Sequence, residues 1–302
     1  MELYINKVNK SFSDTQILKD ISFKVTSGKA MGFLGRNGAG KTTTIRALMG
    51  VFNQDSGEFL LNGKPFIAEE HSVGYLPEER GMYPKEEIFN QLLYFGMLRG
   101  GDKKELSKNI DYWLTRVGLL EYKKKKLETL SKGNQQKIQI VEALVNNPSI
   151  IIFDEPFSGL DPVNSMVLKD IILELIADNK LVIFSSHQMS YVEEFCDEIT
   201  LIHQGEIVLT GNLEEIKKQR GKNKIRVTFI DTDEEQIINA LSDYYDVALK
   251  KDKLSYILHV PSEENPTKLL SKLLDHNLQM TSFQPYLPSL TEIFVETAGE
   301  IL

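Results

Sequence analysis

The chain has 302 residues, of which 41% are hydrophobic and 26% charged, a composition typical of a globular protein with room for two domains. Its net charge of −8 argues against nucleic acid as a partner, because general nucleic-acid binding needs a basic surface. The single cysteine, Cys196, excludes an internal disulfide and a cysteine-rich metal site. No apolar run is long enough to cross a bilayer, and the first residues lack a signal-peptide pattern, so we expect the protein to stay in the compartment where it is made.

Strand and helix patterns alternate from Glu2 to about Gln219 and predict an α/β domain at 1–220. Short apolar or alternating runs predict its strands, which include 2–8, 21–25, 30–34, 149–153 and 181–184. Residues 86–147 have helical periodicity and few strand signals, so they predict a helical insert in this domain. The dipeptide Asn62-Gly63 predicts a hairpin turn.

A polar, lysine-rich stretch at Lys217–Asn223 predicts a boundary, followed by a smaller domain at 221–302. The expected elements of this domain follow the order strand, helix, strand, strand, helix, strand, which is typical of a ferredoxin-like α+β domain. A last helix is expected at 290–297.

Residues 35–43 match G-x-x-x-x-G-K-[ST], the phosphate-binding P-loop, and lie between an apolar run and a helical pattern. Three glycines, Gly35, Gly38 and Gly40, are expected to adopt φ angles that are closed to other residues. Backbone N–H groups can then turn toward a phosphate chain. Lys41 adds a positive charge for the β- and γ-phosphates, and Thr42 places a hydroxyl on Mg²⁺. The residues expected around ATP are therefore Gly35, Arg36, Asn37, Gly38, Ala39, Gly40, Lys41, Thr42 and Thr43.

The apolar run 150–153 ends in Asp154-Glu155, an arrangement typical of the second phosphate-site element, the Walker B motif. Asp154 is expected to hold Mg²⁺ through water, opposite Thr42. Glu155 is the expected catalytic base, because a carboxylate at this place can polarise the attacking water. The two elements together predict ATP and Mg²⁺ at one site.

The segment Leu130-Ser131-Lys132-Gly133-Asn134 resembles the Leu-Ser-Gly-Gly-Gln signature of the ATP-binding cassette (ABC) family. Lys132 and Asn134 depart from that signature. Ser131 and Gly133 keep what is needed at a helix N-terminus that faces a γ-phosphate, namely a hydroxyl and an unhindered amide. The resemblance therefore implies that Ser131 and Gly133 contact ATP.

Three further elements occur in the order that the ABC family has them. Ser158–Pro162 resembles the D-loop, which crosses between subunits, and this implies that Asp161 lies at the nucleotide. His187 resembles the catalytic switch histidine, whose imidazole would hydrogen-bond the γ-phosphate and the attacking water. Phe12 resembles the aromatic residue that stacks on adenine.

Glu78 stands where the ABC family usually has the glutamine of the Q-loop. A carboxylate can still ligate Mg²⁺, because a hard cation prefers charged oxygen, but it cannot donate a hydrogen bond unless it is protonated. The metal role carries over to Glu78, whereas a donor role does not. The alternative is that Glu78, Glu79 and Arg80 form a solvated charge cluster.

The resemblance implies the P-loop NTPase fold of the ABC type and an ATPase that dimerises head to tail around two ATP–Mg²⁺, either as a homodimer or with a paired ATPase subunit. A separate transmembrane permease would receive the work, which places the subunit in the cytoplasm, peripheral on the inner face of the cell membrane. The stretches 77–84 and 290–294 resemble a narrower group, the ATPase subunits of bacterial exporters of the sodium- or drug-efflux type.

The helical insert is the expected contact surface for the permease. Its dense apolar cluster is expected to be mostly core, with a few residues left for the partner: Phe89, Leu92, Leu93, Tyr94, Phe95, Met97 and Leu98. Two other interpretations stay open. The chain could be a soluble ABC ATPase that acts on a cytosolic assembly, or a transport ATPase in which residues 224–302 sense a ligand or dimerise.

Overall fold

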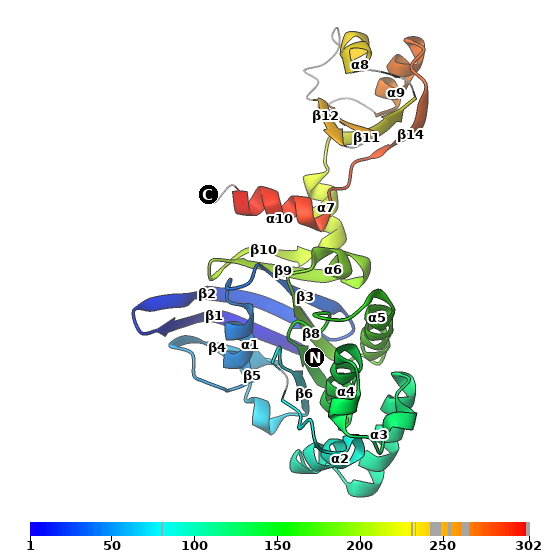
Figure 1. The fold of residues 1–302 in the computed structure, drawn as a ribbon. Helices are drawn as coiled ribbons and strands as arrows, with labels where there is room; N and C mark the ends of the chain where they lie inside the picture. The colour runs from blue at the N-terminus through cyan, green and yellow to red at the C-terminus, as the bar shows by residue number, and fades with distance from the viewer. Residues whose placement is uncertain are drawn as a thin grey trace. The chain divides into compact units, whose positions relative to one another are not determined.

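The computed structural model describes residues 1–79, 81–230, 232, 234–241, 249–252, 255–260 and 266–299, so that Arg80 of the charge cluster considered above lies outside it. The contacts divide the chain into two units, Met1–Leu213 and Glu214–Leu302 (Figure 1). This division lies a few residues before the boundary that the lysine-rich stretch predicts. The reason is helix α7 (Leu213–Arg220), which Arg220 joins to the second unit through a hydrogen bond to Thr297.

The first unit begins with an antiparallel sheet in the order β2-β1-β4-β5. Its strands are β1 (Glu2–Phe12), β2 (Thr15–Thr26), β4 (Ser56–Leu61) and β5 (Lys64–Pro65), and the first two are longer than the alternating pattern predicts. Asn62 and Gly63 have φ angles of 51° and 78°, the signs that a tight hairpin turn between two strands requires. The predicted hairpin is confirmed.

The second sheet of this unit has six strands in the order β10-β9-β3-β8-β7-β6, and only the β9–β10 pair is antiparallel. The strands are β3 (Ala30–Leu34), β6 (Val73–Leu76), β7 (Ile150–Phe153), β8 (Leu181–Ser186), β9 (Glu198–His203) and β10 (Glu206–Asn212). In an open parallel sheet, ligands bind beyond the carboxyl ends of the strands. The loops that follow β3, β6, β7 and β8 therefore meet at one edge, and they carry many of the predicted site residues.

Alternating residues of the parallel strands build two separate packing faces. One face, which includes Phe33 and Ile152, shares a core with the antiparallel sheet and with α1 (Lys41–Leu48) (Figure 1). The other face is covered by α5 (Pro162–Ala177) and α6 (Met189–Phe195), where the rings of Phe184 and Phe195 stack 5.2 Å apart. Helix α1 is thus held between two sheets, with its N-terminus at the carboxyl edge of β3.

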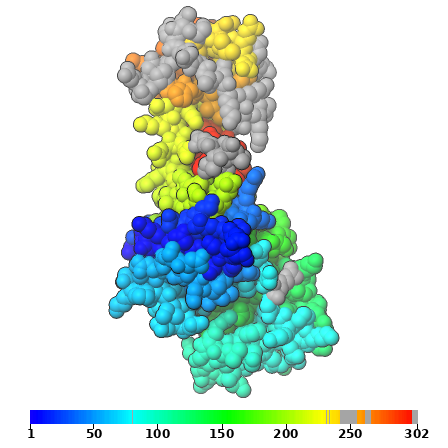
Figure 2. All heavy atoms as spheres, turned by 90° about the vertical axis from the view of Figure 1, so that its left-hand side faces the viewer, coloured from blue at the N-terminus to red at the C-terminus, as the bar shows by residue number. Residues whose placement is uncertain are grey.

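Residues 86–147, where the sequence predicts a helical insert, contain α2 (Ile88–Leu98), α3 (Lys103–Arg116) and α4 (Lys132–Leu144). Short 3-10 turns occupy 120–122 and 127–129, and another, outside the insert, occupies 68–70. Asp102 caps the N-terminus of α3, where its side chain accepts hydrogen bonds from two backbone N–H groups. The space-filling view follows the first unit from the dark blue of β1 and β2 to the cyan and teal of this insert (Figure 2).

The interpretation of the apolar cluster on α2 as mostly core is wrong. Of its seven residues only Leu92 is buried, whereas Tyr94, Met97 and Leu98 are exposed. The physical reason is that α2 packs against α3 and α4 along one stripe, and the remaining apolar side chains lie outside that stripe.

The second unit has the predicted ferredoxin-like topology. Its elements in chain order are β11 (Lys224–Phe229), α8 (Glu234–Leu241), β12 (Leu249–Asp252), β13 (Ser255–His259), α9 (Pro266–Asp275) and β14 (Met280–Pro285). The strands form an antiparallel sheet in the order β12-β13-β11-β14, and apolar residues of α8 and α9 pack on one face of it. The last helix, α10 (Leu290–Gly299), follows the sheet. In the part of the chain that the structure describes, no helix has both the length and the apolar character that a membrane crossing requires.

Candidate active site at the carboxyl edge of the parallel sheet

The P-loop connects the end of β3 to the first residue of α1. Gly40 caps the helix with a φ angle of 114°, a backbone conformation in which a residue with a side chain would be strained. The expectation of a positive φ at Gly35 is wrong. That glycine is required by space instead, because a Cβ atom there would lie 2.5 Å from the Ile202 carbonyl oxygen. The backbone N–H groups at the start of α1 face a cavity of about 220 Å³.

The cavity collects residues from three loops of the sheet edge. It is lined by Asn37, Gly38, Gly40, Lys41, Thr42, Thr43, Glu78 and Glu155. Three predicted P-loop residues, Gly35, Arg36 and Ala39, are not part of this lining. Ala39 packs into the core and its N–H donates to the Arg36 carbonyl oxygen at 3.1 Å, so that amide is already used. The cavity lining thus consists mainly of the P-loop and the first residues of α1.

Lys41 is buried and its ammonium contacts three oxygen atoms. Nζ donates to the carbonyl oxygens of Gly35 at 2.8 Å and Arg36 at 3.3 Å, and it lies 3.2 Å from Oε1 of Glu155. The charge of Lys41 is therefore held at the mouth of the P-loop by the loop's own carbonyls and by the carboxylate that follows β7.

Glu155 is the centre of this arrangement. Its backbone has a φ angle of 52°, which is uncommon for a residue other than glycine, and its side chain is buried. Oε2 lies 2.8 Å from Nδ1 of His187, the residue that follows β8. A carboxylate between a lysine and a histidine, at the edge of a phosphate cavity, has the geometry of a general base with an orienting partner.

Asp154 is fully buried beside Glu155, and burial raises the pKa of its carboxyl group while the hydroxyls of Ser185 and Thr42 oppose the shift. Ser185 Oγ donates to Oδ1 of Asp154 at 2.5 Å and accepts from the N–H of Glu155 at 2.9 Å. Oδ2 of Asp154 is buried with no hydrogen-bond partner among the described residues. A divalent cation at that oxygen would offset the cost of burying the charge.

The residues around Asp154 fit Mg²⁺ rather than a protein-only metal cage. Thr42 and Glu78 line the P-loop cavity, whereas Asp154 lies outside its lining. Asp154 is close enough to both residues for the Thr42 hydroxyl to lower its pKa and for the charge of Glu78 to raise it. Within the described ranges, no three His, Cys, Asp or Glu side chains converge as a metal site would need. This pattern suits Mg²⁺, which is usually held by one or two carboxylates together with substrate phosphates and water.

Ser131, Gly133 and Asp161 lie outside the cavity lining in the single chain. Ser131 caps α4, where its Oγ accepts from the N–H of Asn134 at 3.3 Å. Asp161 caps α5 by accepting the N–H of Asn164 at 2.9 Å, and this hydrogen bond is the main reason that its pKa is lowered. All three residues therefore lie at helix N-termini, outside the lining of this chain's own P-loop cavity.

Ser185 is the site residue that sequence reasoning missed. Its signal is positional, because Phe184 pairs with Phe153 in the parallel register of β7 and β8, which places Ser185 directly beside Asp154. Phe12 ends β1 with 46% of its surface exposed, as an aromatic platform for a base requires.

The P-loop, the buried Asp154 and the Lys41–Glu155–His187 cluster define the chain as a P-loop ATPase. A profile of the ABC transporter family matches residues 18–158, and a profile of the C-terminal domain of DrrA1-3-like ATP-binding proteins matches residues 211–298. An uncharacterized ABC transporter ATP-binding protein of Bacillus subtilis, YhaQ, is 36% identical over 99% of each chain. The chain belongs to the ATP-binding proteins of ABC transporters.

Two further comparisons agree with this assignment. The linearmycin resistance ATP-binding protein LnrL of Bacillus subtilis is 31% identical over 99% of each chain. A solved ATP-binding subunit of an ABC transporter has a TM-score of 0.67 at 27% identity, over 73% of this chain and 94% of its own. As a member of this family the protein binds and hydrolyses ATP to power transport, together with transmembrane components.

Proposed function

We propose that this chain hydrolyses Mg²⁺-ATP at the P-loop cavity with Glu155 as the general base, and that it does so in a head-to-tail dimer that drives an exporter. The observation that carries the proposal is the meeting of Lys41 and His187 on one buried carboxylate, at 3.2 Å and 2.8 Å. The N–H groups of α1 and Lys41 would bind the phosphates. Glu155 would then take the proton of the attacking water.

The residues around Glu155 would orient the base and hold the metal ion. When phosphate draws Lys41 away, Glu155 keeps His187, so the base stays oriented. Thr42 and Asp154 would hold Mg²⁺, with Glu78 reaching the same cavity from the loop after β6. The ion, when bound, would neutralise charge on the phosphate oxygens. Ser185 keeps Asp154 and the backbone of Glu155 in place.

A second chain would complete the site. Ser131 caps α4 and Asp161 caps α5, and neither lines the cavity of its own chain. A helix N-terminus with a hydroxyl cap and Gly133 in its first turn binds an anion well. In a head-to-tail dimer, Ser131 and Gly133 of one chain would face the γ-phosphate on the other, and ATP would join the two.

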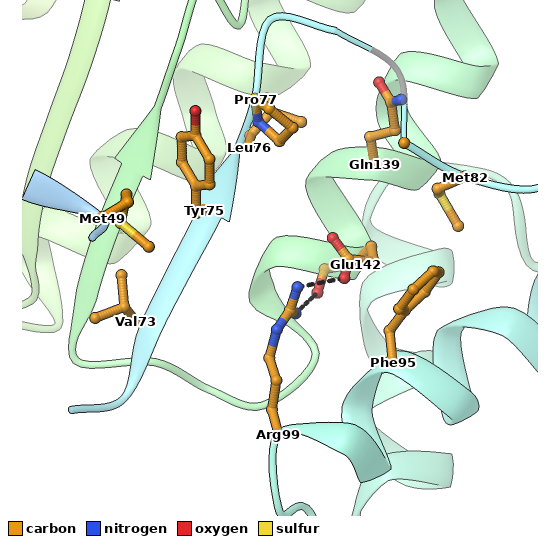
Figure 3. A pocket seen from close by; sticks show the side chains of 11 residues that line it. Met49, Val73, Tyr75, Leu76, Pro77, Met82, Phe95, Arg99, Gln139 and Glu142 are labelled. Carbon is orange, nitrogen blue, oxygen red and sulfur yellow. Dashed lines mark hydrogen bonds and ion pairs between the residues drawn. The ribbon is translucent and has the colours of Figure 1, made fainter. Parts of the chain in front are cut away.

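The permease contact that we propose is a groove beside α2. A cavity of about 320 Å³ lies between β6, α2 and α4 (Figure 3). In this view Arg99 and Glu142 point toward each other, and Phe95 and Met82 lie to the right of Glu142. Arg99 Nη2 lies 2.5 Å from Glu142 Oε1. An adjoining hollow shares Met49, Val73 and Arg99 with it. An apolar groove with an ion pair in its wall suits a short amphipathic segment of a membrane protein.

Export is the direction that the comparisons favour. One of the relatives that match over nearly their whole length is named for linearmycin resistance, and the second unit matches a DrrA1-3-like C-terminal domain. With a permease bound at the groove, the chain would lie peripherally on the inner face of the cell membrane.

Replacing Glu155 with Gln tests the assignment of the base. The amide keeps the shape of the side chain but cannot accept a proton, so turnover should fall about 10²–10⁴-fold. ATP binding should persist, and size-exclusion chromatography in ATP should show a dimer. Turnover close to that of the wild type would show that Glu155 is not the base.

A further inference from the structure

Phe12 is held in place by the loop that follows α1, through contacts that none of the motifs accounts for. Asp55 makes most of them. Its Oδ2 accepts the N–H of Ser11 at 2.6 Å, its Oδ1 accepts Lys10 Nζ at 2.9 Å, and its own N–H donates to the Asn9 carbonyl oxygen at 2.8 Å. One aspartate therefore fixes the three consecutive residues that precede Phe12.

Lys10 and Phe52 hold the ring itself. Lys10 has only 15% of its side chain exposed, and Nζ lies 5.4 Å from the ring centre of Phe12 and 5.5 Å from that of Phe52. The same ammonium donates to the Asn53 carbonyl oxygen at 2.7 Å. The Phe12 and Phe52 rings meet at 84° with centres 5.2 Å apart, the edge-to-face arrangement that aromatic pairs favour.

These contacts connect two parts of a nucleotide site. Phe52, Asn53 and Asp55 lie in the loop that follows α1, the helix that starts at the P-loop. Phe12 lies at the end of β1, on a different sheet from the P-loop strand. Lys10, Phe52 and Asp55, here called the clamp, connect the loop after α1 with the end of β1. The clamp therefore fixes the distance between Phe12, the proposed platform for the base, and α1, the helix proposed to bind the phosphates.

We propose that Lys10, Phe52 and Asp55 are positioning residues for the base of ATP, which hold Phe12 where it stacks on adenine. This rests on the proposed function, in which Phe12 is the platform. None of Lys10, Phe52 and Asp55 lines the P-loop cavity, so their contribution concerns only ligands that carry a base. Inorganic triphosphate, which has the phosphates and no base, is therefore the matched comparison ligand.

The test measures the dissociation constants of Mg²⁺-ATP and of Mg²⁺-triphosphate for the full-length chain and its variants. Lys10→Met keeps the aliphatic stem but loses the charge over the rings, and Phe52→Leu keeps an apolar contact but loses the ring. Each should weaken ATP binding about three- to tenfold, the size of a cation–π or edge-to-face contact, and leave triphosphate binding unchanged. Phe12→Ala should weaken ATP binding at least as much.

Lys24→Met is the control, because Lys24 forms an exposed ion pair with Glu2 on the same sheet and should change neither constant. Equal weakening of both ligands by Lys10→Met and Phe52→Leu would show a general loss of structure and overturn the inference. So would unchanged ATP binding in those two variants while Phe12→Ala weakens it. If Phe12→Ala itself spares ATP binding, the assignment of the platform fails, and the inference with it.

Discussion

Glu155 occupies a left-handed backbone conformation, which costs a residue other than glycine about 1–3 kcal/mol. Its surroundings over-determine that conformation, because Ser185 accepts its N–H while Lys41 and His187 hold the two carboxylate oxygens. The side chain of Glu155 lines the P-loop cavity, where the proposed base would have to be. Strain of this kind is typical of functional sites whose supporting contacts are strong enough to offset it.

Glu78 gives a test of the metal site at the scale of one residue. If Glu78 helps to hold Mg²⁺, Glu78→Ala should raise the Mg²⁺ concentration for half-maximal ATPase activity by about tenfold, the loss typical of a carboxylate removed from a metal site. Glu78→Gln should have a smaller effect, because an amide oxygen still coordinates the ion but carries no charge. A Mg²⁺ titration of the ATPase rate measures both.

The neighbouring residue provides the control. Glu79 has 88% of its side chain exposed and lies 3.7 Å from Nη2 of Arg46, so Glu79→Ala should leave the Mg²⁺ titration unchanged. If Glu78→Ala titrates like Glu79→Ala, Glu78 is a surface charge and the metal role is wrong.

The candidate site residues that the structure brings together belong to short contiguous motifs, each of which carries its own local geometry. Asp154 and His187 each stand directly after a strand, and Lys41 begins the helix that follows β3 and the P-loop. Parallel strands bring those ends together. Ser185 could not be found in this way, since its contact with Asp154 depends on the register of two strands. The constraint at Gly35 was also out of reach, because it comes from the carbonyl of Ile202, far along the chain.

Helix α2 shows where apolar content misleads at the scale of one element. Hydrophobic residues on a helix predict burial only when they fall on the stripe that meets a neighbour. Tyr94, Met97 and Leu98 fall outside that stripe and remain exposed beside Arg99, which lines the groove. Exposed apolar residues grouped next to a groove indicate a surface for a partner.

Leu98→Glu tests that surface. Leu98 is 65% exposed, so the charge should leave the fold and ATP binding intact. At a permease interface, however, a buried unpaired carboxylate is costly, and we expect membrane association to weaken about tenfold or more. The measurement is the fraction of the chain that sediments with membranes that contain the permease.

The matched control is Leu274→Glu on α9, where a leucine is exposed to 56% in the second unit. It should sediment with membranes as the wild type does. If Leu98→Glu sediments with membranes as fully as Leu274→Glu does, this face of α2 is not the permease contact.

At the scale of the whole molecule, the order of helices and strands along the chain predicted most of the architecture. The alternation of strands and helices predicted the parallel sheet, and the βαββαβ order predicted the antiparallel sheet of the second unit. The position of the division was less accessible, because α7 has the composition of a linker but is joined to α10 by the bond from Arg220 to Thr297.

The central claim is that two chains build each ATP site, and mixing two inactive variants tests it most directly. Lys41→Ala removes the phosphate-binding charge, and Ser131→Arg blocks the signature helix. In a head-to-tail heterodimer of the two, one composite site carries both changes and the other carries neither. The ATPase rate of the mixture should therefore exceed that of either variant alone. If heterodimers form, as shown by differently tagged chains, and the rate does not recover, Ser131 does not act on the nucleotide of the partner chain.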